Sequence, residues 1–199
     1  MSTSGLFDIK KQLTFYGAYH SNPINITIHE VCVPILLWTF QVMASVLPVP
    51  AFIPAVHVAI NQWFTFDLNV PALHALLYII YYFALEHTAA ALYVPQLVLS
   101  LLTATAFSYT PDAIKYATAL HIGSWIAQFV GHYGPEGRSP ALLDNIVGAV
   151  VLAPFFVHLE VLFALGYKPE LHRELKNSIG TEILKIKRAK KASKREDEQ

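Results

Sequence analysis

Long stretches of the chain carry no charged side chain, and this feature constrains the fold more than any other. Asp, Glu, Lys and Arg are absent from residues 31–66, 87–111, 116–135 and 145–159. A helix that spans a bilayer needs about 20 mostly apolar residues. We therefore predict membrane helices near residues 31–47, 71–86, 89–107, 114–132 and 145–166.

Prolines limit how many of these segments can cross a membrane. Pro48, Pro50 and Pro54 break any helix through residues 48–57, where we expect a loop or a re-entrant piece. Pro95 and Pro154 interrupt two further segments. The predicted fold is all-α: a polytopic integral membrane helical bundle of about four spans plus one interfacial or re-entrant segment.

The composition argues against several classes of protein. Charged residues make up 14% and hydrophobic residues 54% of the 199 residues, whereas a soluble domain carries about a quarter charged residues. An ordinary cytosolic globule, a disordered chain and a nucleic-acid binder are therefore disfavoured. The single cysteine, Cys32, excludes an internal disulfide bond and a thiolate metal cluster.

The charges are distributed unevenly along the chain. Residues 1–167 hold four basic and eight acidic side chains, and residues 168–199 hold ten basic and six acidic ones. Lys10 and Lys11 precede the first apolar segment, and the basic tail follows the last. Because basic flanks stay on the cytoplasmic side, we expect both termini in the cytosol and an even number of spans. Residues 170–199 are expected to form a polar helix beside anionic headgroups.

Two histidines flank a predicted turn near the N-terminus. Asn22 is a good N-cap and Pro23 occupies the favoured first helical position, so one helix should end near His20 and the next begin after Asn22. This turn can bring His20 and His29 together, whereas on one unbroken helix they would lie on opposite faces. Imidazole is the commonest protein ligand for metals, so a joint metal site is one reading. Two separate interfacial histidines are the other.

A second polar group lies on one stripe of the predicted helix 114–132. At 100° per residue, His121, Gln128 and His132 fall within a narrow sector. Such a stripe must face a protein interior or a water-filled cavity, which fits either a ligand site or a hydrogen-bonded helix interface. His121 and His132 would lie about 16 Å apart along a continuous helix, too far to share one ion. Either the helix breaks near Gly131, or His121 serves a second shell, a second ion or the substrate. We therefore rank His132 above His121 as a ligand.

Two charged residues follow the predicted helix 114–132, and three more histidines lie elsewhere in the chain. Glu136 and Arg138 lie in a loop with glycine and proline, and a guanidinium suits a carboxylate ligand. A surface ion pair between the two is the alternative. Near the ends of predicted spans, three more histidines are expected at the interface: His57, His74 and His87.

The two groups together resemble the 2-hydroxy fatty acid dioxygenase family of small endoplasmic-reticulum membrane proteins. The first motif is Tyr19-His20-x-Asn22-Pro23-x-Asn25-x-x-x-His29-x-x-x-x-Pro34. The second is Trp125-x-x-Gln128-Phe129-x-Gly131-His132-x-x-x-Glu136-x-x-x-Pro140-Ala141-Leu142. The resemblance extends from about Gly5 to Pro169. It implies that residues 1–169 form a single membrane catalytic domain and that residues 170–199 form a cytosolic tail.

The resemblance also implies a reaction and a set of ligands. The reaction is an Fe(II)-dependent α-oxidation in phytosphingosine breakdown. A 2-hydroxy long-chain fatty acid and O₂ would give the fatty acid one carbon shorter, CO₂ and water, with no co-reductant. The family's histidines map onto His20, His29, His132 and His121. As a hypothesis, Gln128 or Asn25 orients a histidine or the oxygen, and Arg138 holds the substrate carboxylate. Glu30 and Glu136 are candidate ligands where the fold brings them in.

Two other classes of function remain open on the residues alone. A non-enzymatic membrane lipid-binding or membrane-organising protein would use the polar stripe for helix packing. A transporter would use its histidines to relay protons, but neither repeat symmetry nor paired broken helices are visible. Iron that is bound by the protein and lost on replacing His20, His29 or His132 would separate the enzyme from both alternatives.

Overall fold

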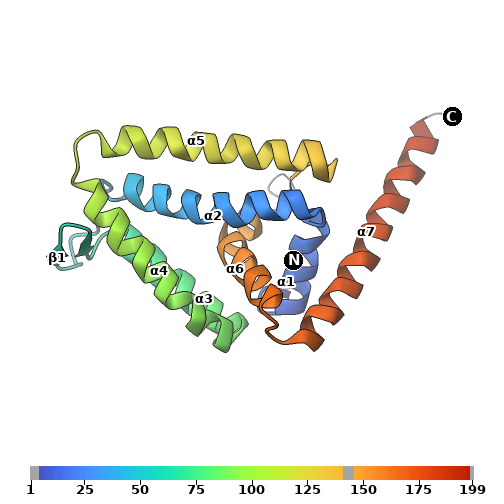
Figure 1. Ribbon diagram of the computed structural model, residues 1–199, viewed down its shortest axis with the longest axis horizontal. Helices are drawn as coiled ribbons and strands as arrows, with labels where there is room; N and C mark the ends of the chain where they lie inside the picture. The colour runs from blue at the N-terminus through green and yellow to red at the C-terminus, as the bar shows by residue number, and fades with distance from the viewer. Residues whose placement is uncertain (1–4, 141–145, 198–199) are drawn as a thin grey trace.

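The computed structural model describes residues 5–140 and 146–197, and nearly all of its regular structure is helical (Figure 1). The helices are α1 (Ile9–Tyr19), α2 (Pro23–Ala44), α3 (Val70–Leu85), α4 (His87–Ser108), α5 (Ala113–Gly131), α6 (Ile146–Ala164) and α7 (Pro169–Asp197). A π-helical turn, η2 (His132–Glu136), continues α5. Each of the five predicted membrane segments thus overlaps one helix, and the first of these helices begins at Pro23, directly after the predicted N-cap Asn22.

The helices differ in whether they are long and apolar enough to cross a membrane. Two helices, α2 and α4, are long and apolar enough to cross a membrane. Helix α3 and residues 150–164 of α6 are apolar but shorter. Among the described residues α5 does not join the candidate spans, so the four-span bundle stays a prediction.

The described residues confirm the predicted all-α class, and a short two-stranded hairpin lies between two of the helices. Strand β1 (His57–Asn61) pairs antiparallel with β2 (Phe64–Asp67). The Asn61 side chain accepts hydrogen bonds from the backbone N–H groups of Trp63 and Phe64 at 2.8 and 3.0 Å, which closes the turn. Residues 48–57, by contrast, contain no helix, as their prolines predict.

The hairpin is fastened to the end of α4 through one carboxylate. Asp67 accepts a hydrogen bond from the Tyr109 hydroxyl at 2.6 Å and contacts His57 Nδ1 at 2.7 Å. His57 therefore lies on an exposed hairpin and not at the end of a span.

Helices α2 and α5 lie side by side along the length of the molecule, and α1, α3, α4 and α6 gather beneath them in the view of Figure 1. The core contains stacked aromatic rings from α3 and α6: Tyr82 and Phe155 lie 4.5 Å apart between ring centroids, and both are almost fully buried. The Tyr82 hydroxyl donates to the Val151 carbonyl at 2.7 Å. Helix α7 packs its first half on α1 through Leu175 and then projects away.

Glu86 joins two chain reversals at one end of the bundle. Its carboxylate caps α4 by accepting from the Ala89 N–H at 2.5 Å, and it also accepts from the Tyr167 hydroxyl at 2.8 Å and Lys168 Nζ at 2.7 Å. Burial raises the pKa of Glu86, but these three donors outweigh it and hold the pKa below its ordinary value. The α3–α4 junction is thereby tied to the α6–α7 junction.

We expect Glu86→Gln to destabilise the protein at neutral pH by about 1–2 kcal/mol, because charged hydrogen bonds are lost. A carboxyl whose folded pKa is depressed stabilises above its unfolded pKa of about 4.3 and loses that contribution as the pH falls through the folded pKa. The difference in Tm between wild type and variant in detergent should therefore shrink below about pH 4. A difference that stays constant from pH 7 to pH 3 would contradict this role.

Candidate metal centre

The turn between α1 and α2 brings His20 and His29 together. Helix α1 ends at Tyr19, and the Asn22 side chain caps α2 by accepting from the Ile24 N–H at 2.9 Å, with Pro23 in the first turn. This confirms the predicted N-cap. The imidazole centroids of His20 and His29 lie 4.4 Å apart.

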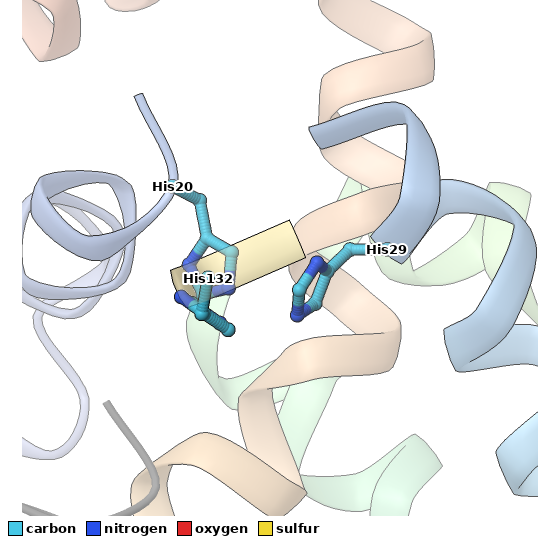
Figure 2. Close-up of side chains that lie close together, drawn as sticks. All are labelled: His20, His29 and His132. Atoms are coloured by element: carbon cyan, nitrogen blue, oxygen red, sulfur yellow. The ribbon is translucent and has the colours of Figure 1, made fainter. Parts of the chain in front are cut away.

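His132 completes the group from a distant part of the chain. It is the first residue of η2, where α5 gives way to a π turn. Its ring centroid lies 4.8 Å from that of His20 and 4.9 Å from that of His29. Figure 2 shows the three side chains converging from separate backbone segments. One nitrogen of each lies within 4.8 Å of the others, and all three side chains are buried.

Backbone carbonyls fix the tautomers of two of these histidines. Nδ1 of His20 lies 2.9 Å from the Tyr16 carbonyl oxygen, and Nδ1 of His29 lies 2.9 Å from that of Asn25. A carbonyl oxygen can only accept, so each Nδ1 carries the proton and each Nε2 keeps a lone pair. His20 Nε2 and His132 Nδ1 are buried and have no hydrogen-bond partner among the described residues. A buried lone pair without a partner is costly, and a bound cation would satisfy it.

The charge states suit metal ligation, which needs neutral imidazole. Burial, together with the neighbouring His29, lowers the pKa of His20 well below its usual value despite the hydrogen bond to Tyr16. Burial likewise lowers the pKa of His132 to about 4. Three nitrogens that share one ion through bonds of about 2.1 Å lie about 3.0–3.6 Å from one another. The three side chains would therefore have to move closer together to hold one ion.

The structure does not bring His121 into this group. Trp125 Nε1–H donates to His121 Nε2 at 3.1 Å, which places the His121 proton on Nδ1. His121 Nδ1–H then donates to Thr39 Oγ1 at 2.8 Å, and the Thr39 hydroxyl donates to the Ile35 carbonyl at 2.8 Å. Helix α5 is unbroken from Ala113 to Gly131. His121 is therefore far from His132 along the helix, as expected for a continuous helix. His121 instead joins α5 to α2 and holds the Trp125 ring.

Glu136 fastens the two halves of the centre together. Its carboxylate accepts from the Ser21 N–H at 3.1 Å, the Ser21 hydroxyl at 2.6 Å, the Asn22 N–H at 2.9 Å and Asn25 Nδ2 at 3.2 Å. Burial raises the pKa of Glu136, but these donors prevail and hold it below its ordinary value. Because its oxygens face the α1–α2 turn, Glu136 positions His132 against His20 and His29.

Arg138 reinforces the same junction. Its guanidinium donates to the Ala18 carbonyl and lies 4.2 Å from the centroid of the Tyr19 ring, and its backbone N–H donates to the His132 carbonyl at 3.1 Å. No ion pair between Glu136 and Arg138 occurs among the described residues. The guanidinium is thus engaged with the end of α1, and its predicted contact with a substrate carboxylate stays a prediction.

An apolar cavity extends from the three histidines. It has an empty volume of about 950 Å³, with open solvent at its mouth included. Its walls come from α1, α2, α3, α5 and α6, and neither Glu136 nor Arg138 is among the described residues that line it. Gln128 lies in the wall one helical turn before His132, and its Nε2 is buried without a partner in the part of the chain that is described.

Sequence reasoning missed two contributions to this region. His74 was expected at the interface but lies in the cavity wall, with its Nδ1 buried. Ser21 supplies two of the donors to Glu136, although nothing in its sequence context distinguishes it from an ordinary turn serine. Both contacts join segments far apart in the chain, which a local pattern cannot reveal. Ala141 and Leu142 of the second motif lie outside the described residues.

We expect Gly131→Ala to disrupt the centre, because a Cβ there would lie 2.5 Å from Asn25 Oδ1 and 3.2 Å from Ile28 Cδ1. Asn25 would have to move away from Glu136, at a cost of about 1–3 kcal/mol. Gly134→Ala, in the same turn, is the matched control, since no described atom of another segment lies within 4 Å of its added Cβ. Tm and bound metal should fall for Gly131→Ala alone. Equal effects of the two variants would contradict the close approach.

Comparisons with known proteins show the family of the chain. A family model described as 2-hydroxy-palmitic acid dioxygenase Mpo1-like matches residues 6–165. The chain is similar to the 2-hydroxy-palmitic acid dioxygenase MPO1 of Saccharomyces cerevisiae, with 34% identity over 176 residues, which cover 88% of this chain and 91% of the yeast protein. No solved structure matches. The chain belongs to the Mpo1-like family.

Proposed function

We propose that this chain is an Fe(II)-dependent 2-hydroxy fatty acid dioxygenase that removes one carbon from its substrate. The observation that carries the proposal is the convergence of His20, His29 and His132, buried and neutral, at one end of an apolar cavity. The relationship to a yeast protein named 2-hydroxy-palmitic acid dioxygenase supports the choice of substrate class.

Three histidines do not by themselves select iron over other metals, so we choose iron from the redox chemistry that the reaction requires. Imidazole suits zinc, copper, iron and nickel, and many iron oxygenases add a carboxylate ligand that is absent from this group of described residues. Zinc undergoes no redox change, whereas O₂ must receive electrons in the reaction. Fe(II), when bound, would supply this redox chemistry and open positions for the substrate and O₂. The net reaction, RCH(OH)COOH + O₂ → RCOOH + CO₂ + H₂O, balances without another reductant.

The protein's own groups would bind and orient the substrate. Gln128 Nε2 is a buried donor in the cavity wall with no described partner, so it is placed to donate to the substrate carboxylate or hydroxyl beside His132. The apolar wall would receive the hydrocarbon chain and exclude water from the reacting carbons. Glu136 and Arg138 act as positioning residues through the α1–α2 turn and the end of α1.

We expect His20→Ala, His29→Ala and His132→Ala each to lose bound iron and to lower turnover by more than about 100-fold, because changes even in the outer shell of a metal can cost that much. The assay is anaerobic loading with Fe(II) in detergent, followed by O₂ and 2-hydroxypalmitate, with pentadecanoate measured by mass spectrometry. His57→Ala is the control, since His57 lies on the exposed hairpin.

Gln128→Leu should separate metal binding from substrate binding. It should keep its iron, yet lose about 10–150-fold in kcat/KM, the equivalent of one hydrogen bond to a charged group. A Gln128→Leu protein with unchanged kcat/KM would remove Gln128 from the site.

A non-enzymatic lipid-binding protein would give different results in the same assay. A folded wild-type protein that binds fatty acid but neither iron nor O₂ would be a lipid-binding membrane protein. Iron binding without oxygen consumption on any 2-hydroxy acid would point to another substrate or to a storage or sensing role.

We further propose that the chain lies in the endoplasmic-reticulum membrane with about four spans and both termini in the cytosol. Support comes from the two long apolar helices and from outward-facing side chains on α5, where Ile122, Ile126 and Val130 are 54%, 58% and 60% exposed along one stripe. The orientation follows the basic residues at both ends.

The membrane proposal predicts that the protein stays with the membrane fraction after alkaline carbonate extraction, because its apolar surface is solvated by lipid. Epitope tags at the two termini should both be cleaved by protease added to intact microsomes. Release into the alkaline supernatant would contradict integral insertion, and protection of one tag would contradict the even number of spans.

A further inference from the structure

The cavity runs along the groove between α2 and α5. These helices are antiparallel, and two contacts fix their register: the His29 and His132 rings lie 4.9 Å apart, and Thr39 Oγ1 lies 2.8 Å from His121 Nδ1. On α2 the lining begins at His29 and ends at Phe40, and on α5 it runs from His132 back to His121. Each stretch advances 11 residues, so the cavity is roughly 16 Å long at about 1.5 Å per residue.

Aromatic rings stand at the end of the cavity remote from the three histidines. The Phe40 and His74 centroids lie 4.8 Å apart, and those of His74 and Tyr78 lie 4.1 Å apart. These three rings, which we call the end wall, bridge α2 and α3. The Tyr78 hydroxyl donates to the Val150 carbonyl at 3.2 Å and so holds the wall against α6.

The helices close on one another beyond the end wall. Val42 of α2 is fully buried and belongs to the same small core cluster as Ala113 and Ala117 of α5, which are 3% and 1% exposed. Small alanines allow α5 to approach α2 closely there. A chain lying in the groove therefore has no space past Phe40 and His121.

We propose that the end wall limits the length of the acyl chain that the enzyme accepts. This inference rests on the proposed function, which places the 2-hydroxy acid head at the three histidines. An extended hydrocarbon advances about 1.25 Å per carbon, given bonds of about 1.5 Å and near-tetrahedral angles. The roughly 16 Å groove thus holds about 13 carbons beyond the head, and 2-hydroxy acids of about 14–16 carbons fill it.

The wall acts through its shape and not through the polarity of His74. The His74 ring lies between two aromatic side chains and is tilted against both, so a phenyl ring at this position keeps the wall closed. Removing the ring opens it. A pair of variants at one position therefore separates a steric role from a polar one.

The test is a chain-length profile of kcat/KM for 2-hydroxy acids of increasing length at equal mole fraction in detergent. The kcat/KM of the wild-type protein should fall by roughly tenfold or more once the acyl chain is longer than the cavity, since overfilling a packed space costs about 1–3 kcal/mol. Phe40→Ala and His74→Ala should move this fall to chains roughly two to four carbons longer, about the depth of a phenyl ring. His74→Phe should keep the wild-type profile. Leu77→Ala, on the exposed side of α3, is the matched control.

A second measurement keeps the end wall testable without turnover. Metal-free protein is titrated with fatty acids of increasing length in competition with a fluorescent fatty acid. The break in affinity should lie at the same length as the fall in kcat/KM and should shift in Phe40→Ala. If no 2-hydroxy acid is turned over but the break shifts, the proposed function fails and the end wall stands. If Phe40→Ala and His74→Ala both keep the wild-type dependence on chain length, the end wall does not limit the acyl chain. The same conclusion follows if His74→Phe shows the chain-length profile of His74→Ala.

Discussion

The carboxylate of Glu136 is the interaction on which the candidate centre depends. Three histidines must meet, and they come from the end of α1, the first turns of α2 and the end of α5. The α1–α2 turn fixes two of them by local geometry alone. The third arrives from more than one hundred residues away, and Glu136 attaches it by accepting hydrogen bonds from Ser21, Asn22 and Asn25. Removing this side chain would leave backbone donors of the α1–α2 turn without an acceptor. The same contact therefore supports both the candidate centre and the fold around it.

The pairing of α2 with α5 carries part of the candidate metal centre at one end and the proposed end wall at the other. One end of the pair carries His29 and His132, and the other carries Thr39 and His121. His121 resembles a metal ligand in sequence, yet both its nitrogens are used to register the helices and to hold Trp125 in the cavity wall. Of the two histidines on the polar stripe, His121 thus supports the cavity wall, and His132 belongs to the candidate metal centre.

Much of this arrangement could be predicted because it is local. The Asn22–Pro23 break, the helix bounds and the spacing that separates His121 from His132 all follow from helical geometry. The hairpin at His57–Asp67 was missed because the prediction concerned only the proline-rich residues 48–57 before it, although the β-branched and aromatic residues of the hairpin favour strands. The partners of Glu136 and the place of His74 could not be read from the sequence, since both depend on contacts between distant helices.

The change from α-helix to π turn at His132 has a consequence for how this segment can vary. The His132 carbonyl accepts the backbone N–H groups of both Gly137 and Arg138, and Gly137 adopts a left-handed conformation with φ of 68°. A loss of one residue between His132 and Glu136 would leave hydropathy and charge nearly unchanged, yet it would rotate the following chain by about 100° relative to α5. Glu136 would then face away from the α1–α2 turn. The length of this turn, more than the identity of most of its residues, therefore sets the phase between the two parts of the centre.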